Sequence, residues 1–220
     1  MSRIVALCFL LLAAVLGFLH IDSRPIWAPF VVSASPHIDE EVDEVVTATT
    51  KTKTSSKVAV PTSQANWLPD TGAPSVHAAS LIALNDGAVR AFWFAGSREG
   101  AADVSIYSSV YDSHSANWSA PTVVMDRISA EKGLSRYIAK LGNPVPSRRP
   151  DGRLQLFFVT VSIGGWAGSS ISAITSDDEG LTWGNPQRLI SSPLLNLSTL
   201  VKSPSVLFAD GLLGLPAYHE

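Results

Sequence analysis

The residues of this 220-residue chain that are best suited to chemistry include an adjacent arginine and glutamate, Arg98 and Glu99. They lie between Gly96 and Gly100, which allow a tight turn and the close approach of a ligand. An arginine guanidinium can hold a carboxylate through two parallel hydrogen bonds, so we expect Arg98 to bind one. The alternative is a surface ion pair of Arg98 with Glu99 or Asp103, which contributes little to stability.

Three side chains are candidates for proton transfer. Glu99 and Asp103 are expected to supply a general acid, with a pKa raised by burial or by a neighbouring carboxylate. His77 begins a predicted strand, and its imidazole can carry a proton near neutral pH or donate a hydrogen bond to a substrate. A histidine that only makes local hydrogen bonds at a strand end is the alternative. No metal is expected, because five histidines show no close ligand spacing and one cysteine cannot build a zinc site.

Four more polar side chains stand at the ends of predicted strands. Asn143 and Lys202 open corresponding strands of two successive repeats, and His219 and Glu220 end the last strand. Because these ends match those of the candidates above, we expect all of them to share one concave face and to contact a substrate. An ordinary turn before a proline is the alternative for Asn143 and Lys202.

The stretch that organises the chain is Ser176-Asp177-Asp178-Glu179-Gly180-Leu181-Thr182-Trp183, of the form Ser-x-Asp-x-Gly-x-Thr-Trp. It predicts a hairpin turn in which Asp178 accepts hydrogen bonds from backbone amides and Gly180 takes a positive φ. The return strand begins at Thr182, and the indole of Trp183 is expected to cover the edge of a sheet. Asp178 is therefore interpreted as a structural residue and not as a catalytic acid.

A repeat surrounds this stretch. Asp86-Gly87 and Asp151-Gly152 are 65 residues apart (151 − 86), as are Trp118 and Trp183 (183 − 118), and a third copy reaches Asp210-Gly211. The first two copies have the strands and tryptophan turn of a propeller blade, although the first lacks the eight-residue motif, and the third copy ends in its second strand. The predicted strands lie at 78–84, 88–94, 103–111, 143–147, 153–162, 170–175 and 187–190, with a connecting helix within 127–141.

The N-terminal part is expected to lie outside the repeat. Ile4 to Ile21 is an apolar run of 18 residues, about 27 Å long as a helix, and predicts a membrane signal anchor within residues 1–24. Cleavage as a signal peptide at Val32-Ser33-Ala34 is the alternative. Residues 25–72 are acidic and then rich in threonine, lysine and serine, which predicts a disordered linker. A net charge of −3 without a basic stripe gives no support to nucleic-acid binding.

Residues 73–220 resemble the N-terminal half of the sialidase-like (neuraminidase-like) β-propellers with BNR repeats and Asp boxes, often called exo-α-sialidases. The resemblance rests on the motif at 176–183 and on Val76-His77-Ala78-Ala79-Ser80, Gly96-Ser97-Arg98-Glu99-Gly100, Lys140-Leu141-Gly142-Asn143-Pro144 and Tyr218-His219-Glu220. It implies an all-β, six-bladed β-propeller whose active site lies at one end of the central channel. The chain would hold about two and a half of these blades and is expected to be a fragment.

The resemblance also implies a glycoside hydrolase that acts on terminal acidic sugars of glycans without a cofactor. It would be membrane-anchored facing outside the cytoplasm, or secreted or periplasmic after cleavage. The implied catalytic residues are Glu99, Asp103 and His77, and the implied substrate-binding residues are Arg98, Asn143, Lys202, His219 and Glu220.

One departure from the family pattern keeps other functions open. Typical sialidases have a Phe-Arg-Ile-Pro stretch where this chain has His77-Ala78-Ala79-Ser80, and their nucleophilic tyrosine and later arginines would fall beyond residue 220. The alternatives are a non-catalytic propeller that binds glycans or proteins, a uronate-directed propeller lyase, and an inactive truncated product.

Overall fold

The computed structural model describes residues 3–19, 65–190 and 197–220. The chain divides into two compact units, Met1–Ser35 and Pro36–Glu220. In the first, α1 (Arg3–Leu19) is a mainly apolar helix. The predicted anchor is not confirmed, since none of the helices in the described ranges is long and apolar enough to cross a membrane. The expected cleavage site and residues 25–64 of the expected linker lie outside the described residues.

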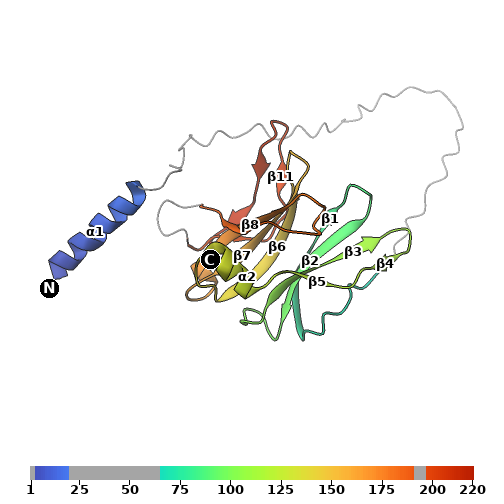
Figure 1. The fold of residues 1–220 in the computed structure, drawn as a ribbon, viewed down its shortest axis with the longest axis horizontal. Helices are drawn as coiled ribbons and strands as arrows, with labels where there is room; N and C mark the ends of the chain where they lie inside the picture. The colour runs from blue at the N-terminus through green and yellow to red at the C-terminus, as the bar shows by residue number, and fades with distance from the viewer. Residues whose placement is uncertain (1–2, 20–64, 191–196) are drawn as a thin grey trace, which may run out of the picture. The chain divides into compact units, whose positions relative to one another are not determined.

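The second compact unit consists of antiparallel β-sheets (Figure 1). The strands of the first sheet are β1 (Ser75–Ala83), β2 (Val89–Gly96), β3 (Ser105–Asp112), β4 (Asn117–Trp118) and β5 (Thr122–Met125). Those of the second sheet are β6 (Lys140–Arg148), β7 (Leu154–Val161), β8 (Ser169–Ser176) and β9 (Gln187–Arg188). A third repeat contains the short pairs β10 (Leu200–Val201) with β13 (Ala217–Tyr218) and β11 (Val206–Leu207) with β12 (Leu213–Gly214). The predicted all-β class is confirmed. The sheets of the described residues do not close into a ring, so the number of six blades stays a prediction.

The connecting helix is shorter than predicted. α2 (Arg127–Leu134) begins after Asp126, whose carboxylate accepts a hydrogen bond from the backbone N of Ser129 at 2.7 Å. It ends at Ser135, which has the left-handed conformation with φ 50°. The prediction of a helix over Arg127–Leu141 was wrong because the left-handed backbone of Ser135 ends the helix after Leu134. The chain from Lys140 onward forms β6 instead.

The start of the β-rich region differs slightly from the predicted boundary at residue 73. Leu68 packs against the buried cluster around Trp93, and the Asn66 side chain donates a hydrogen bond to the Tyr111 hydroxyl at 3.2 Å. Residues 65–72 therefore belong to the surface of the first sheet and not to a linker.

The main core lies between the first and second sheets. Phe92 of β2 and Phe158 of β7 are fully buried members of this cluster. A second cluster lies between the second sheet and the third repeat, where Val159 contacts the group that includes Leu200. Because successive side chains of a strand point to opposite faces, β7 supplies Phe158 to one cluster and Val159 to the other. The second sheet is thus buried on both faces, which explains the continuous apolar run of its central strand.

The first and second sheets each begin with a bulged strand. Ala78 in β1 and Asn143 in β6 lie within the bulges, 65 residues apart (143 − 78), and have positive φ values of 52° and 47°. The third repeat is interrupted at the corresponding place, after β10, where Lys202 follows. Bulges redirect a side chain away from the regular ladder, so each repeat presents one residue at a similar position.

The motif at 176–183 has the predicted turn geometry. Asp178 accepts hydrogen bonds from the backbone N of Thr182 at 2.8 Å, the Thr182 hydroxyl at 2.6 Å and the Ser176 hydroxyl at 2.7 Å. These bonds, that of the Thr182 hydroxyl above all, lower the pKa of Asp178 from 3.8 to about 2. Gly180 has φ 87°, and the Trp183 ring meets Phe92 edge-on with centroids 5.9 Å apart.

Glu179, in the same motif, joins the two sheets. Its carboxylate accepts two hydrogen bonds of 2.8 Å from Arg148 and one of 2.6 Å from Asn85. Its backbone O accepts a hydrogen bond of 2.9 Å from Nε of Arg90, which lies in β2 and is only 4% exposed. A Cβ atom on Gly180 would lie 2.9 Å from the same Nε, so glycine is needed for this approach.

Substitution of two glycines separates backbone strain from crowding. Gly152 and Gly180 have φ values of 86° and 87°, but no atom lies within 4 Å of a Cβ on Gly152. Gly152→Ala should cost about 1 kcal/mol for the left-handed backbone. Gly180→Ala should cost about 3 kcal/mol, because it also displaces Arg90. Urea unfolding measures both, and equal midpoints for the two variants would contradict the crowding at Gly180.

Asp178→Asn should remove part of the acid sensitivity of the fold. Asp178 has a pKa of about 2 in the folded chain against an ordinary 3.8, so at intermediate pH the unfolded state takes up the proton first. Its carboxylate therefore stabilises the fold fully above the ordinary pKa, and this contribution is lost as the pH falls through the folded pKa. In urea unfolding monitored by circular dichroism, the advantage of wild type over Asp178→Asn should disappear with falling pH. An advantage that is constant down to the folded pKa would refute this assignment.

Candidate functional site

The ends of the sheets opposite the Glu179 connection carry the predicted site residues. In the second sheet, Arg148 pairs with Leu154 at the Glu179 end, and Lys140 pairs with Val161 at the other end. In the first sheet, the β1–β2 turn reaches Glu179 through Asn85, so the start of β1 and the loop after β2 lie at the other end. The residues gathered there come from all three repeats.

A cavity of about 280 Å³, here called the site pocket, opens at this end. It is lined by Glu99, Asn143, Trp166, Leu200, Lys202, Tyr218 and Glu220. Four of these, namely Glu99, Asn143, Lys202 and Glu220, are residues that the sequence singled out. The lining combines two carboxylates, an amide, an ammonium group and two aromatic rings, which suits a polar ligand with a ring of its own.

Asp103 does not have the electrostatics expected of a general acid. Its carboxylate accepts hydrogen bonds from the hydroxyl of Ser97 at 2.9 Å and from the backbone N of Ser97 at 3.0 Å. Asp103 is exposed, and its pKa is lowered above all by the hydrogen bond from the Ser97 hydroxyl. The prediction of a raised pKa was wrong for Asp103, because hydrogen bonds to the charged form outweigh burial. Asp103 instead closes the loop that carries Arg98 and Glu99.

Arg98 lies next to the site pocket but does not line it. Its side chain is exposed, and its guanidinium forms neither a hydrogen bond nor an ion pair with any residue of the described ranges. The surface ion pair considered for Arg98 is therefore not formed in this structure. Arg98 precedes the pocket residue Glu99 in the same loop, and its charge contributes to the lowered pKa of Asp103.

The two predicted histidines also lie outside the pocket lining. His77 is exposed, with Nε2 2.9 Å from the Ser75 hydroxyl and its ring 5.5 Å from that of Phe94. Nδ1 of His219 lies 2.6 Å from the backbone O of Ser198. Since a carbonyl oxygen only accepts, Nδ1 carries the proton, and Nε2 of the neutral ring is left as an acceptor.

The sequence did not identify Trp166 and Lys140 as site residues. Trp166 begins η1 (Trp166–Gly168), between β7 and β8, and the Lys140 ammonium lies 5.7 Å from the centre of its ring. Gly100 and Gly142 make room for this pair, since a Cβ would lie 3.4 Å from Cδ of Lys140 and 3.0 Å from the Trp166 ring, respectively. The available signal was an aromatic residue directly after Gly164-Gly165, at the same end of the sheet as Asn143.

The described residues offer no evident metal site. Among residues 3–19, 65–190 and 197–220, no three His, Cys, Asp or Glu side chains form a group that would hold a metal ion.

Ser97 should control the pKa of Asp103. Ser97→Ala removes the hydroxyl donor and should raise the pKa of Asp103 towards its ordinary value, because only the backbone donor at 3.0 Å then remains from residue 97. Ser97→Thr keeps a hydroxyl and serves as the control, with little change expected. Carboxyl ¹³C NMR of labelled protein measures both titrations. An unchanged pKa in Ser97→Ala would show that this hydroxyl does not hold the loop closed.

Comparison with known proteins places this geometry in a family. A model of the BNR repeat-like domain matches residues 87–220, more than half of the chain. No curated protein sequence matches. Among solved structures, the Hadza microbial sialidase Hz136 superposes with a TM-score of 0.52 at 16% identity, over 64% of this chain and 32% of the sialidase. An endo-arabinase from Bacteroides thetaiotaomicron superposes with a TM-score of 0.44 at 12% identity, over 64% of this chain and 50% of the arabinase.

The matched region includes the Asp box, the bulged β6 and every lining residue of the site pocket. The chain spans about a third of the length of the sialidase, whose likeness shows the fold. The sequence match and the repeated antiparallel sheets agree, and the chain belongs to the family of BNR repeat-like domains.

Proposed function

We propose that this chain is part of a glycoside hydrolase that acts on terminal acidic sugars of glycans. The observation that carries the proposal is the composition of the site pocket, in which two carboxylates and an ammonium group from the first and third repeats and an amide from the second surround one cavity. A sugar ring with a carboxylate needs both kinds of group, because its hydroxyls bond with carboxylates and its charge needs a cation. The sialidase fold supports this choice of reaction class.

Glu99 is the proposed general acid. It lines the pocket, whereas the neighbouring Asp103 carboxylate is held in its charged form by Ser97. In this role Glu99 transfers a proton to the glycosidic oxygen as the bond between that oxygen and the anomeric carbon breaks, and water then adds to the anomeric carbon and returns a proton to Glu99. Glu220 and Asn143, which line the same pocket, are assigned to accept and donate hydrogen bonds with the hydroxyls of the sugar.

Lys202 and Arg98 are the proposed partners of the sugar carboxylate. Lys202 lines the pocket, and the exposed Arg98 directly precedes the pocket residue Glu99 in the chain. A lysine provides a mobile point charge, while an arginine adds two parallel donors. Lys202 is therefore assigned to the carboxylate of the bound sugar, and Arg98 to its capture at the rim.

A non-catalytic glycan-binding propeller is the second candidate. It is favoured by Ala78, which occupies the bulge of β1 in the region where typical sialidases have their first arginine. The first repeat thus adds no cation at that position. A protein that binds a glycan without cleaving it needs fewer functional groups in its site than a hydrolase does.

Glu99→Gln should lower kcat on an acidic glycoside at least about a hundredfold with little change in KM, since it removes the proton donor alone. The full-length protein, isolated from its own cells, is assayed with 4-methylumbelliferyl glycosides of N-acetylneuraminic acid and glucuronic acid, and with the glucoside as neutral comparison. Glu131→Gln, which alters an ion pair of 3.1 Å with Arg127 on α2, is the matched control and should keep full activity.

Two results would overturn the proposed hydrolase. One is full activity of Glu99→Gln, and the other is the absence of hydrolysis of both acidic glycosides by wild type. Binding of these glycosides without hydrolysis would establish the glycan-binding alternative instead.

A further inference from the structure

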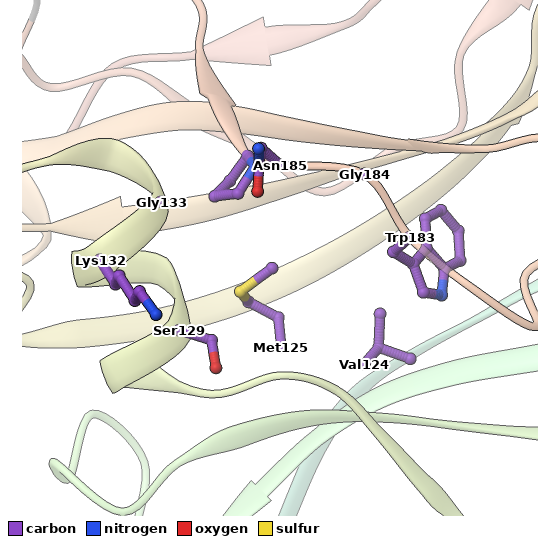
Figure 2. Close-up of a pocket in the computed structure, with 9 residues that line it drawn as sticks. Val124, Met125, Ser129, Lys132, Gly133, Trp183, Gly184 and Asn185 are labelled. Carbon is purple, nitrogen blue, oxygen red and sulfur yellow. The ribbon is translucent and has the colours of Figure 1, made fainter.

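A second and larger cavity lies on the other side of the first core, beside α2. This α2 pocket measures about 540 Å³ and is lined by Val124, Met125, Ser129, Lys132, Gly133, Trp183, Gly184, Asn185 and Pro186. It shares no lining residue with the site pocket. Figure 2 shows Lys132 at one end, Trp183 at the other and Met125 between them.

The walls of the α2 pocket are firmly held. A Cβ atom on Gly133 would lie 2.5 Å from the ring of Pro186, so the helix rests directly on this proline. The backbone N of Gly184 donates to the backbone O of Thr175 at 2.9 Å, which fixes the opposite wall to β8. Asp126 caps the start of α2. The cavity is therefore largely formed before a ligand arrives, as in most small-molecule sites.

The lining has an apolar side and a polar side. Met125 and Trp183 form the apolar part, while Ser129 and Asn185 bring a hydroxyl and an amide and Lys132 an ammonium group. Ser129 and Lys132 are three residues apart on α2 and lie on one face of the helix. This combination of an aromatic wall with fixed hydrogen-bonding groups suits the two faces of a sugar ring.

The charge of the α2 pocket favours an anion. No carboxylate lines it, and Lys132 forms no ion pair within the described part of the chain. The nearest acidic side chain on α2, Glu131, is paired with Arg127 at 3.1 Å, and the Asp126 carboxylate before α2 accepts a hydrogen bond from the backbone N of Ser129 at 2.7 Å. α2 also contacts β9, which carries the exposed Arg188. The charge within the lining itself is that of the Lys132 ammonium group.

We propose that the α2 pocket is a second carbohydrate site, which binds an acidic sugar residue of a glycan without cleaving it. Lys132 binds the sugar carboxylate, Ser129 and Asn185 bind hydroxyls, and Trp183 and Met125 contact the apolar part of the ring. Two sites on one chain raise the avidity for a glycan that carries several acidic sugars.

Met125 provides a direct reporter for this site. The chain contains only two methionines, Met1 and Met125, so a ¹³C-methyl-methionine spectrum has one signal from the floor of the α2 pocket. The full chain is titrated with the methyl α-thioglycoside of N-acetylneuraminic acid, which resists hydrolysis, and with lactose as the neutral comparison. The Met125 signal should shift saturably with the thioglycoside and much less with lactose.

Lys132→Gln should weaken the affinity reported by Met125 about tenfold, the effect of losing one charge-assisted hydrogen bond at a partly exposed site. Lys132 is exposed, so this variant should fold normally. Lys202→Gln, which alters the site pocket, is the matched control and should leave the Met125 titration unchanged.

Three results would overturn this inference: no shift of Met125, equal shifts with lactose, or a shift that Lys202→Gln abolishes and Lys132→Gln does not. The hydrolase assay is independent of these outcomes. A saturable Met125 shift that depends on Lys132 supports the second site even if no glycoside is hydrolysed.

Discussion

The buried guanidinium of Arg90 is the constraint on which the arrangement of the sheets depends. Burial lowers the pKa of Arg90, and Asp178 and Glu179 counteract this effect through their charges. A buried charge without partners is strongly destabilising, so the guanidinium needs acceptors. It finds them in the backbone O of Glu179 at 2.9 Å and the Ser108 hydroxyl at 3.1 Å. Because Arg90 belongs to the first sheet and Glu179 to the second, this requirement fixes the relative position of the two sheets.

The Glu179 end of the sheets is electrostatically satisfied, while the site end is not. At the first end Glu179 is held by Arg148, which lowers the pKa of the glutamate and raises that of the arginine. Hydrogen bonds from Arg153 likewise lower the pKa of Asp151. At the other end Arg98 has no ion pair within the described residues, and Glu99 faces a cavity. The structural carboxylates Asp151 and Glu179 thus lie at one end of the strands, and at the other end Asp103 closes the loop that presents Glu99 to the cavity.

Local turn chemistry and the 65-residue repeat made much of the fold predictable. The Asp box specified its own hydrogen bonds through residue types, and the repeat placed Asn143 and Lys202 at corresponding strand ends. Other features depend on contacts between distant segments. Trp166 becomes part of the pocket only where the β7–β8 connection meets β10 and β13. The lowered pKa of Asp103 depends on how the loop from Ser97 to Asp103 folds back on itself, which residue types alone did not reveal. The helix was overextended because its end depends on one left-handed residue, Ser135.

The bulge position of each repeat is where chemistry can change without a change of fold. Ala78, Asn143 and Lys202 occupy this position in turn, and only the last two reach the site pocket. The Arg90 and Glu179 contacts that join the sheets lie at the opposite ends of the strands, so they place no demand on the residue type at the bulge. Side chains that end in a methyl group, an amide or an ammonium group can therefore stand at this position of a repeat in the same fold. The cation that we propose for the sugar carboxylate therefore comes from the third repeat, as Lys202, while the first repeat contributes Glu99 from a different loop.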